Sequence, residues 1–516
     1  MFNRIKGFLK RVLRRMGLIT TLQNVTDHKK ISVDDDWYAK IGKWLNLYQS
    51  NADYLHDKYK TMFGAKHAKM MMTLNMASMS TKKMASLVFN QKAVIIATPK
   101  VDGPHESSPE DYQTPENVFI QQTLKDNHFY TNFERYLEYM FAMGGIALRL
   151  YTYQGKVRIR FATADSFYPI SSDANGVTEC VIASSFTRNN QYYTLLEWHE
   201  ETDTAYTVSN ELYVSPNKED IGHKTALSSI YPNMAEETVY PKSQYSRPTF
   251  IYLKPNLSNN LDIGSPLGVP IYANAVDTLK MLDQAYDLLF DEYRLGRRRI
   301  TIPDYMVKSK VNSETGKRES YFDPDEEVYQ QFHAEAMGDT SRKPEDITMS
   351  LRNDEIISGI NDLLRLYATQ VGFSPGSFTY DAESGQAKTA TEVVSENSAT
   401  YQTKNSHETL IEEAIKNMCI TILELAKNDQ GVAYSGATDV DVTVNFDDSI
   451  AKDRQENANY YSQITGNKPL MPRLEAIKRF NNLTDVEAKQ WLDQINADEP
   501  DQGDPSSIFG KSESGE

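Results

Sequence analysis

Hydrophobic residues recur along this chain with a helical period in some segments and a strand period in others. From position 34 the pattern is helical, because large apolar residues return at steps of three and four behind an acidic start that suits a helix N-terminus. The repeat consists of Trp37, Ile41, Trp44 and Tyr48. A second helical stretch is predicted over 67–90, where a run of methionines favours core packing over the alternative of an adaptable binding face.

The next part of the chain mixes both periods. Residues 94–98 are predicted to form a strand and residues 118–143 a helix. Beyond this helix the period becomes two, which predicts a hairpin around Gln154-Gly155 and then an antiparallel meander with turns in the sequences RNNQ and ETDT. Residues 34–260 therefore indicate an α+β domain whose sheet is built from local hairpins.

Helical periodicity returns in the second half of the chain. One helix is predicted over 275–293 and another over 357–371. Residues 389–429 contain neither Pro nor Gly, so they are compatible with one helix of roughly 60 Å at 1.5 Å per residue. Only the second half of this helix has an apolar stripe, and we therefore expect its polar first half to bridge or to line a pore. An alternating strand is predicted over 440–448, followed by further helices.

Composition limits the function classes. Hydrophobic residues make up 40% and charged residues 24% of the 516 residues, which is ordinary for a folded soluble protein. The net charge of −16 argues against tight static binding of nucleic acid, although it suits a surface that DNA must pass without sticking, and it is equally compatible with a role in solubility alone. Two cysteines form neither a disulfide framework nor a metal knuckle, which favours folding in a reducing cytoplasm.

The N-terminal segment 1–16 combines apolar residues at helical spacing with six Lys and Arg residues. It lacks the uninterrupted apolar core of a signal peptide, and no run in the chain approaches the roughly 20 apolar residues of a membrane span. An assembly contact and a flexible arm are both compatible with this pattern, with membrane binding a weaker third alternative.

Enzyme motifs are incomplete in this sequence. No phosphate-binding GxxxxGK[ST] motif occurs, and the string that begins at His407-Glu408 has Ile411 where a second zinc ligand is needed. Ser374 stands in a GxSxG sequence, but a helical pattern precedes it and Pro375 has no N–H for an oxyanion hole. Paired carboxylates at 34–36 and 447–448 are more typical of helix caps than of cation sites. We expect no enzyme activity and no cofactor.

A dense basic cluster follows the helix predicted over 275–293. It consists of Arg294, Arg297, Arg298 and Arg299. A solvated face, an inter-subunit salt-bridge site and a contact with DNA phosphate are all compatible with it.

Several stretches carry a resemblance to a known family. They are KMASLVFNQKAVI, NLDIGSPLGVPIYANAVDTLKMLDQAYDLLFDEYRLGRRRI, GFSPGSFTYDAESGQAKTATEVVSENSATYQTKNSHETLIEEAI and VNFDDSI. In their order and spacing, over residues 35–495, the chain resembles the portal proteins of tailed bacteriophages, in the branch of long-tailed phages of Gram-positive hosts. The resemblance implies a mainly helical α+β portal fold with a wing, a two-helix stem, a clip, a tunnel loop that leads into a long helix, and a crown.

The resemblance also implies a division of the chain. The segments are a basic N-terminal arm at 1–33, the wing at 34–264, a stem helix at 265–296, the clip at 297–351, a second stem helix at 352–373, the tunnel loop at 374–388, the long helix and a return strand to the wing at 389–450, the crown at 451–497 and a disordered acidic tail at 498–516. The loop residues expected to face passing DNA are Ser377, Phe378, Thr379, Tyr380, Asp381, Glu383, Gln386 and Lys388.

The partners implied by the resemblance are those of a capsid vertex. They are eleven further copies in a dodecameric ring, double-stranded DNA passing without sequence readout, the terminase large subunit, the scaffold and major capsid proteins, and a head–tail adaptor. The protein is then expected in the virion after assembly in the host cytoplasm, with a role in packaging and ejection of DNA and no membrane contact. The alternative is a minor capsid or adaptor protein without a DNA channel.

Overall fold

The computed structural model combines helices and antiparallel strands, so the coarse α+β class is confirmed. It describes residues 22, 24–31, 33, 35–60, 66–90, 93–100, 113–296, 300–303, 309–311, 318–320, 329–332, 345–346, 348–379, 396–446, 461–465, 471–481 and 485–498.

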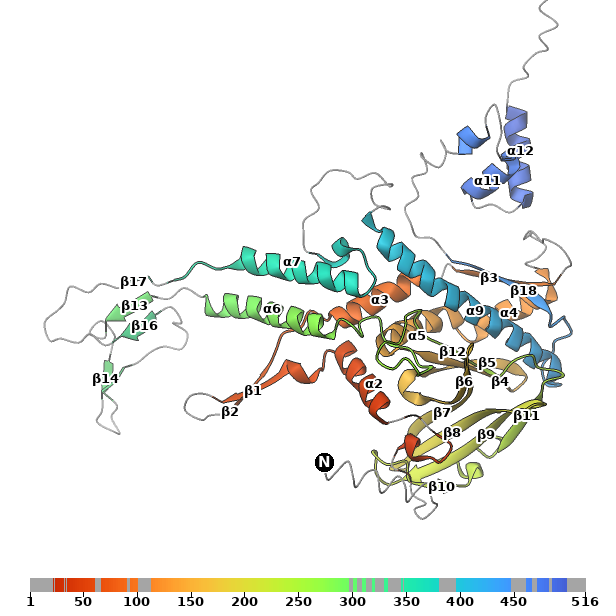
Figure 1. Ribbon diagram of the computed structural model, residues 1–516, viewed down its shortest axis with the longest axis horizontal. Coiled ribbons are helices and arrows are strands. Elements are labelled where there is room, and N and C mark those ends of the chain that lie inside the picture. The colour runs from red at the N-terminus through yellow and green to blue at the C-terminus, as the bar shows by residue number, and fades with distance from the viewer. Residues whose placement is uncertain are drawn as a thin grey trace, which may run out of the picture.

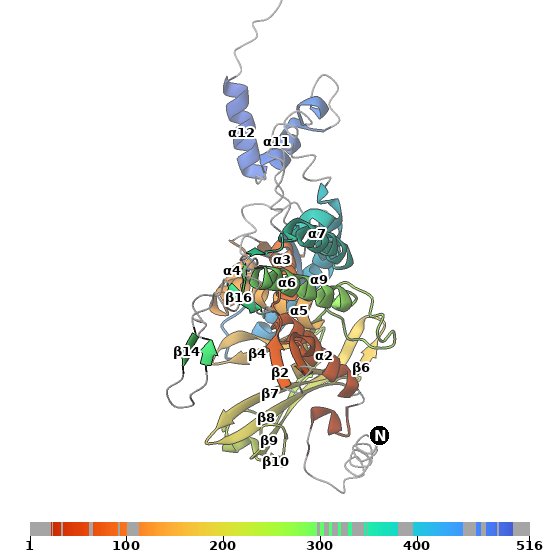
Figure 2. The same cartoon turned by 90° about the vertical axis from the view of Figure 1, so that its left-hand side faces the viewer.

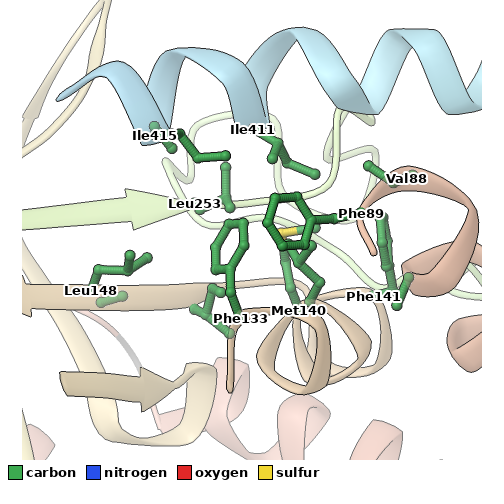
Figure 3. Close-up of a cluster of buried hydrophobic side chains, with 14 of the residues drawn as sticks. Val88, Phe89, Phe133, Met140, Phe141, Leu148, Leu253, Ile411 and Ile415 are labelled. Atoms are coloured by element: carbon green, nitrogen blue, oxygen red, sulfur yellow. The ribbon is translucent and has the colours of Figure 1, made fainter. Parts of the chain in front are cut away.

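The largest hydrophobic core lies between helices from both halves of the chain. Figure 3 shows Ile411 and Ile415 of the long helix α9 above aromatic side chains of α5, with Phe89 beside them. Side chains such as Phe133 and Met140 are fully enclosed there, because α5 carries a broad apolar face. The helices of this region are α2 (Asp35–Tyr48), α3 (Met76–Val88), α4 (Pro115–Asp126), α5 (Phe129–Met143) and α9 (Ser398–Asn428).

Two antiparallel sheets adjoin these helices. The hairpin predicted around Gln154-Gly155 is confirmed, since Tyr153 pairs with Lys156 across it. The meander and both of its turns are also confirmed. The first sheet has the order β12-β4-β5 and the second β10-β9-β8-β7-β6, with β11 also on β9. Their strands are β4 (Ile146–Tyr153), β5 (Lys156–Thr163), β6 (Phe167–Asp173), β7 (Gly176–Arg188), β8 (Gln191–Glu201), β9 (Ala205–Ser215), β10 (His223–Thr225), β11 (Glu237–Pro241) and β12 (Phe250–Leu253).

A buried ionic cluster joins the two sheets. Arg149 of β4 binds the carboxylate of Glu197 on β8, and His199 Nε2 lies 3.0 Å from the other carboxylate oxygen. Burial opposes the charge on Glu197, but the bonds from His199 and Arg149 outweigh it and hold the pKa of Glu197 below its usual value. The cluster therefore fixes one sheet against the other through a paired, buried charge.

A short third sheet brings distant parts of the chain together. Strand β18 (Val440–Asn445) pairs in antiparallel register with β3 (Val94–Pro99), so both predicted strands are confirmed. The single helix predicted over 118–143 is wrong, because α4 ends at Asp126 and α5 begins at Phe129. The break occurs where His128 adopts a left-handed φ of 48° and the side chain of Asn127 bonds to backbone groups of β5 at 3.0 Å.

The helix predicted over 67–90 is wrong in its first third. Strands β1 (His56–Lys60) and β2 (Lys66–Met70) form a hairpin, and α3 begins only at Met76. The methionines divide accordingly: Met76 and Met84 are buried in the core, whereas Met70 is 59% exposed. Core packing thus explains only part of the methionine run.

Helices α6 (Val276–Leu295) and α7 (Asn353–Gln370) lie side by side and extend away from the sheets (Figure 1, seen end-on in Figure 2). The strands between them in sequence are β13 (Ile300–Pro303), β14 (Ser309–Val311), β15 (Arg318–Ser320), β16 (Tyr329–Phe332) and β17 (Glu345–Asp346). Near the C-terminus, α11 (Arg473–Asn481) and α12 (Asp485–Asp498) pack on each other.

Helix α9 is described over 31 residues, and the predicted start at 389 lies outside the described part of the chain. The expectation that its polar first half avoids the core is wrong. Thr400, Lys404 and His407 are each less than 6% exposed. They continue the apolar stripe at steps of three and four, so one face of α9 is buried along its whole described length.

Candidate DNA-channel elements

The paired helices α6 and α7 are held together at both ends. Near the sheets, Leu279 and Leu282 of α6 belong to the same buried cluster as Leu364 of α7. At the far end, the Arg352 guanidinium donates to Glu292 at 2.8 Å, and the Arg352 backbone N–H donates to the same carboxylate at 3.1 Å. These bonds hold the pKa of Glu292 below its usual value. The projecting pair is thus closed by a charge-assisted contact.

A ladder of aspartates lines another side of α6. Asp283 accepts bonds from the Leu74 N–H at 3.0 Å and the Tyr54 hydroxyl at 2.8 Å, while Asp287 accepts from the Met72 N–H at 3.1 Å. Alternate backbone N–H groups of the segment after β2 are therefore satisfied by carboxylates one helical turn apart. Burial raises the pKa of Asp283, which the bonds from Tyr54 and Leu74 partly offset.

Lys69 extends this ladder by one more turn. Its Nζ lies 2.7 Å from Asp287 and 3.0 Å from Asp291. These contacts were not predicted from the sequence, although aspartates at four-residue steps on α6 are a signal of a second occupied face. The ladder fixes the β1–β2 hairpin to the projecting helix.

The chain leaves α7 through a tightly bonded junction. Ser374 is 2% exposed; its N–H donates to the Thr400 hydroxyl at 2.8 Å, and its own hydroxyl lies 3.2 Å from the same oxygen. Just before it, Gly372 has a φ of +82°, and an added Cβ would lie 2.7 Å from the Thr403 side chain. A glycine is required there on both grounds. The junction therefore ties the end of α7 to the first turn of α9.

Lys83 of α3 fixes the next four residues. Its Nζ donates to the Ser377 carbonyl at 2.9 Å and lies 4.9 Å from the centre of the Phe378 ring. Phe378 also packs edge-on against Phe373, with ring centres 5.0 Å apart. Burial lowers the pKa of Lys83. The base of the loop that follows α7 is thus held from two helices, α9 and α3.

The family of the chain follows from a match that covers nearly all of this architecture. Residues 27–501 match the family model described as phage portal protein, SPP1 Gp6-like. The chain belongs to this portal protein family. No curated protein matches the chain. A portal protein is a structural component of the virion at the capsid vertex through which viral DNA is packaged.

The portal loop predicted at 374–388 is described only in its first part. Ser377, Phe378 and Thr379 are half-buried, and the first two contact Lys83. The other predicted channel residues, Tyr380, Asp381, Glu383, Gln386 and Lys388, lie outside the described residues.

Of the predicted basic cluster in the portal subunit, only Arg294 is placed. Its guanidinium lies 3.0 Å from Asp291, and its side chain is 52% exposed. Arg297, Arg298 and Arg299 lie outside the described residues.

The enzyme-like motifs of this portal protein have structural explanations. Helix α7 precedes Ser374 and a 3-10 turn at Pro375–Phe378 follows it, which is not the strand–turn–helix of a nucleophile elbow. His407 Nδ1 accepts a bond from the Asn256 N–H at 3.1 Å, and Ile411 is buried. Across the described segments, no three His, Cys, Asp or Glu side chains are arranged to hold a metal ion. Nor is any described helix long and apolar enough to cross a membrane.

Proposed function

We propose that twelve copies of this portal protein form a ring in a long-tailed phage of a Gram-positive host, through which DNA enters at packaging and leaves at ejection. The observation that carries the proposal is the projecting α6–α7 pair, whose second helix leads through a fixed junction at Ser374 into α9. In a ring of identical subunits, this junction lies at the same height along the ring axis in every subunit, and every copy of the following loop is directed toward the same part of the channel.

The parts of the proposed portal fold correspond to the elements as follows. The stem is α6 and α7, the clip is 297–351, the tunnel loop is 374–388, the wing is made by the helices and sheets of 34–264 together with β18, and the crown is 451–497. The proposed basic arm, 1–33, mostly precedes the family match, and its described residues Leu22, Val25 and Ile31 are buried beside strands of the second sheet.

The loop is proposed to narrow the channel without gripping DNA. Its sequence carries Asp381 and Glu383 with Lys388 as its one cation. Carboxylates repel phosphate and add no counterion-release affinity, so a duplex slides past them. The base of the loop, up to Phe378, is held by its contacts with Thr400 of α9 and Lys83 of α3.

The proposed partners act at different ends of this ring. They are the terminase large subunit during packaging, the scaffold and major capsid proteins during assembly in the host cytoplasm, and a head–tail adaptor afterwards. The basic residues 297–299 are proposed to lie at the junction of stem and clip, where they pair between subunits or meet DNA phosphate.

A packaging assay tests the role of the loop. The double substitution Asp381→Arg with Glu383→Arg is expected to slow DNA packaging while rings still form, because arginines facing the duplex would bind its phosphates. The matched control is Glu236→Arg with Glu237→Arg, which makes the same charge change at exposed positions on and beside β11. Equal packaging rates in both variants would contradict the proposal, as would a cysteine at Asp381 that never cross-links to packaged DNA or to a neighbouring subunit.

A further inference from the structure

In the part of α6 that extends from the sheets, the described residues of the subunit cover two of four sides. On the first side Ala285 and Leu289 pack toward the core, and Glu292 binds Arg352 at the start of α7. The aspartate ladder binds the segment after β2 on a second side. Because successive residues turn by about 100° around a helix, the remaining positions fall on two further sides.

Both remaining sides carry large exposed apolar residues. Met281 is 52% and Leu288 49% exposed, and their seven-residue spacing puts them within about 20° of each other around the helix. Phe290 is 41% and Tyr293 52% exposed, and they continue, further out along α6, the side that Leu279 and Leu282 bury near the sheets. The mean directions of the two pairs differ by about 160°, so they point to opposite flanks of α6. We call them the Met281/Leu288 face and the Phe290/Tyr293 face.

We propose that these two faces are the two halves of one subunit contact, in which the Met281/Leu288 face of one copy packs on the Phe290/Tyr293 face of the next copy. The inference rests on the proposed ring. A closed ring of identical subunits uses a heterologous interface, made of two different patches on opposite flanks of each copy. Helix α6 presents such a pair of patches, and methionine against aromatic rings is a favourable and adaptable contact.

The chemistry of α6 favours a second copy of the chain over DNA as the occupant. Within Val276–Leu295 there are five acidic residues (Asp277, Asp283, Asp287, Asp291, Glu292) and two basic ones (Lys280, Arg294), a net charge of −3. A helix of this charge repels phosphate. Apolar side chains exposed on both flanks are instead typical of a protein–protein contact.

The aspartate ladder explains how α6 can contact the subunits on both of its flanks. Bonds from the backbone N–H groups of Met72 and Leu74 and from Lys69 hold one side of the helix along about two turns, while α7 holds another side. The two exposed faces are therefore fixed relative to each other, which a contact repeated around a closed ring requires.

Disulfide cross-linking of the assembled full-length protein tests this contact. In the double variant Leu288→Cys with Tyr293→Cys, the two thiols point to different flanks of one helix and cannot join within a subunit. Oxidation is expected to give a ladder of covalent oligomers on a non-reducing gel, and each single variant is expected to give none. The two native cysteines, Cys180 and Cys419, are fully buried and add no background.

A second pair and a control complete the experiment. Met281→Cys with Phe290→Cys covers a different register between neighbours, and Val118→Cys with Val239→Cys places two thiols at positions 54% and 52% exposed but outside α6. If electron microscopy finds rings and neither α6 pair cross-links beyond the control, the α6 contact is refuted while the ring stands. If the wild-type chain forms no rings under packaging conditions, the proposed function fails together with it.

Discussion

Replacing His407 by glutamine should remove a pH dependence of stability that one buried imidazole produces. His407 is 2% exposed, and its ring packs edge-on against Phe141 with centres 5.0 Å apart. Its Nδ1 accepts a bond from the Asn256 N–H, so a proton added there would face another donor. Burial lowers the pKa of His407 to about 4, against an ordinary value of 6.5.

The size of the effect follows from this difference. The unfolded chain takes up a proton as the pH falls through 6.5, whereas folded His407 stays neutral until about pH 4. The stabilisation is therefore complete above pH 6.5 and is lost progressively as the pH falls toward 4. At about 1.36 kcal/mol per pH unit, the loss amounts to about 3 kcal/mol in the free energy of unfolding.

Urea denaturation followed by circular dichroism, in steps from about pH 7 to pH 4, measures this loss. The wild type should lose about 3 kcal/mol more than His407→Gln over this range, because glutamine keeps an acceptor for Asn256 but does not titrate. Carboxylates and the other histidines titrate alike in both proteins and cancel in the comparison. Equal pH slopes for the two proteins would refute the assignment of a buried neutral His407.

Three further substitutions have defined outcomes. Lys83→Met should lose about 1–2 kcal/mol of bonding to the loop base, which should make the loop base more sensitive to limited proteolysis and slow packaging without abolishing rings. The control Lys82→Met, at the exposed neighbouring position, should have neither effect. Equal behaviour of the two variants would argue against a role of Lys83 in holding the loop base. Ser374→Ala should cost about 1 kcal/mol of stability and leave packaging intact, and labelling of Ser374 by a serine-directed probe would overturn its structural role. Reversing the charge of all three arginines at 297–299 should impair ring assembly or packaging, and wild-type results in both assays would remove them from the functional set.

The sheets were predictable because their signals are local. Gln154-Gly155 and Asn189-Asn190 all have φ between 49° and 70°, a turn geometry that matches the twist of a hairpin and that Asn and Gly favour. The register of β4 with β5 and of β7 with β8 then follows from each turn. The family resemblance implied only that the strand near 440–448 returns to the wing; its pairing with β3 was not predicted, since nothing local joins strands so far apart in sequence.

The errors lie where tertiary contacts override local pattern. The segment after β2, residues 71–75, is apolar and compatible with a helix, yet its backbone N–H groups donate to carboxylates of α6, which keeps it extended. One face of the polar first half of α9 is buried because Thr400 and His407 find partners in Ser374 and Asn256, which sequence spacing alone does not reveal. The end of a helix shortly before position 374 was predicted correctly from the sequence. The roles of Lys83 and Thr400 in holding this junction could not be predicted, because both residues are brought to it only by the fold.

The most direct test of the account is the assembly state of the purified full-length chain, seen by electron microscopy together with its mass in solution. A portal subunit should give rings of twelve copies with an open axial hole wide enough for duplex DNA, and the α6–α7 pairs should stand side by side around it. Filaments, sheets, closed shells or discrete particles without an axial hole would contradict the central claim that this chain builds a DNA channel.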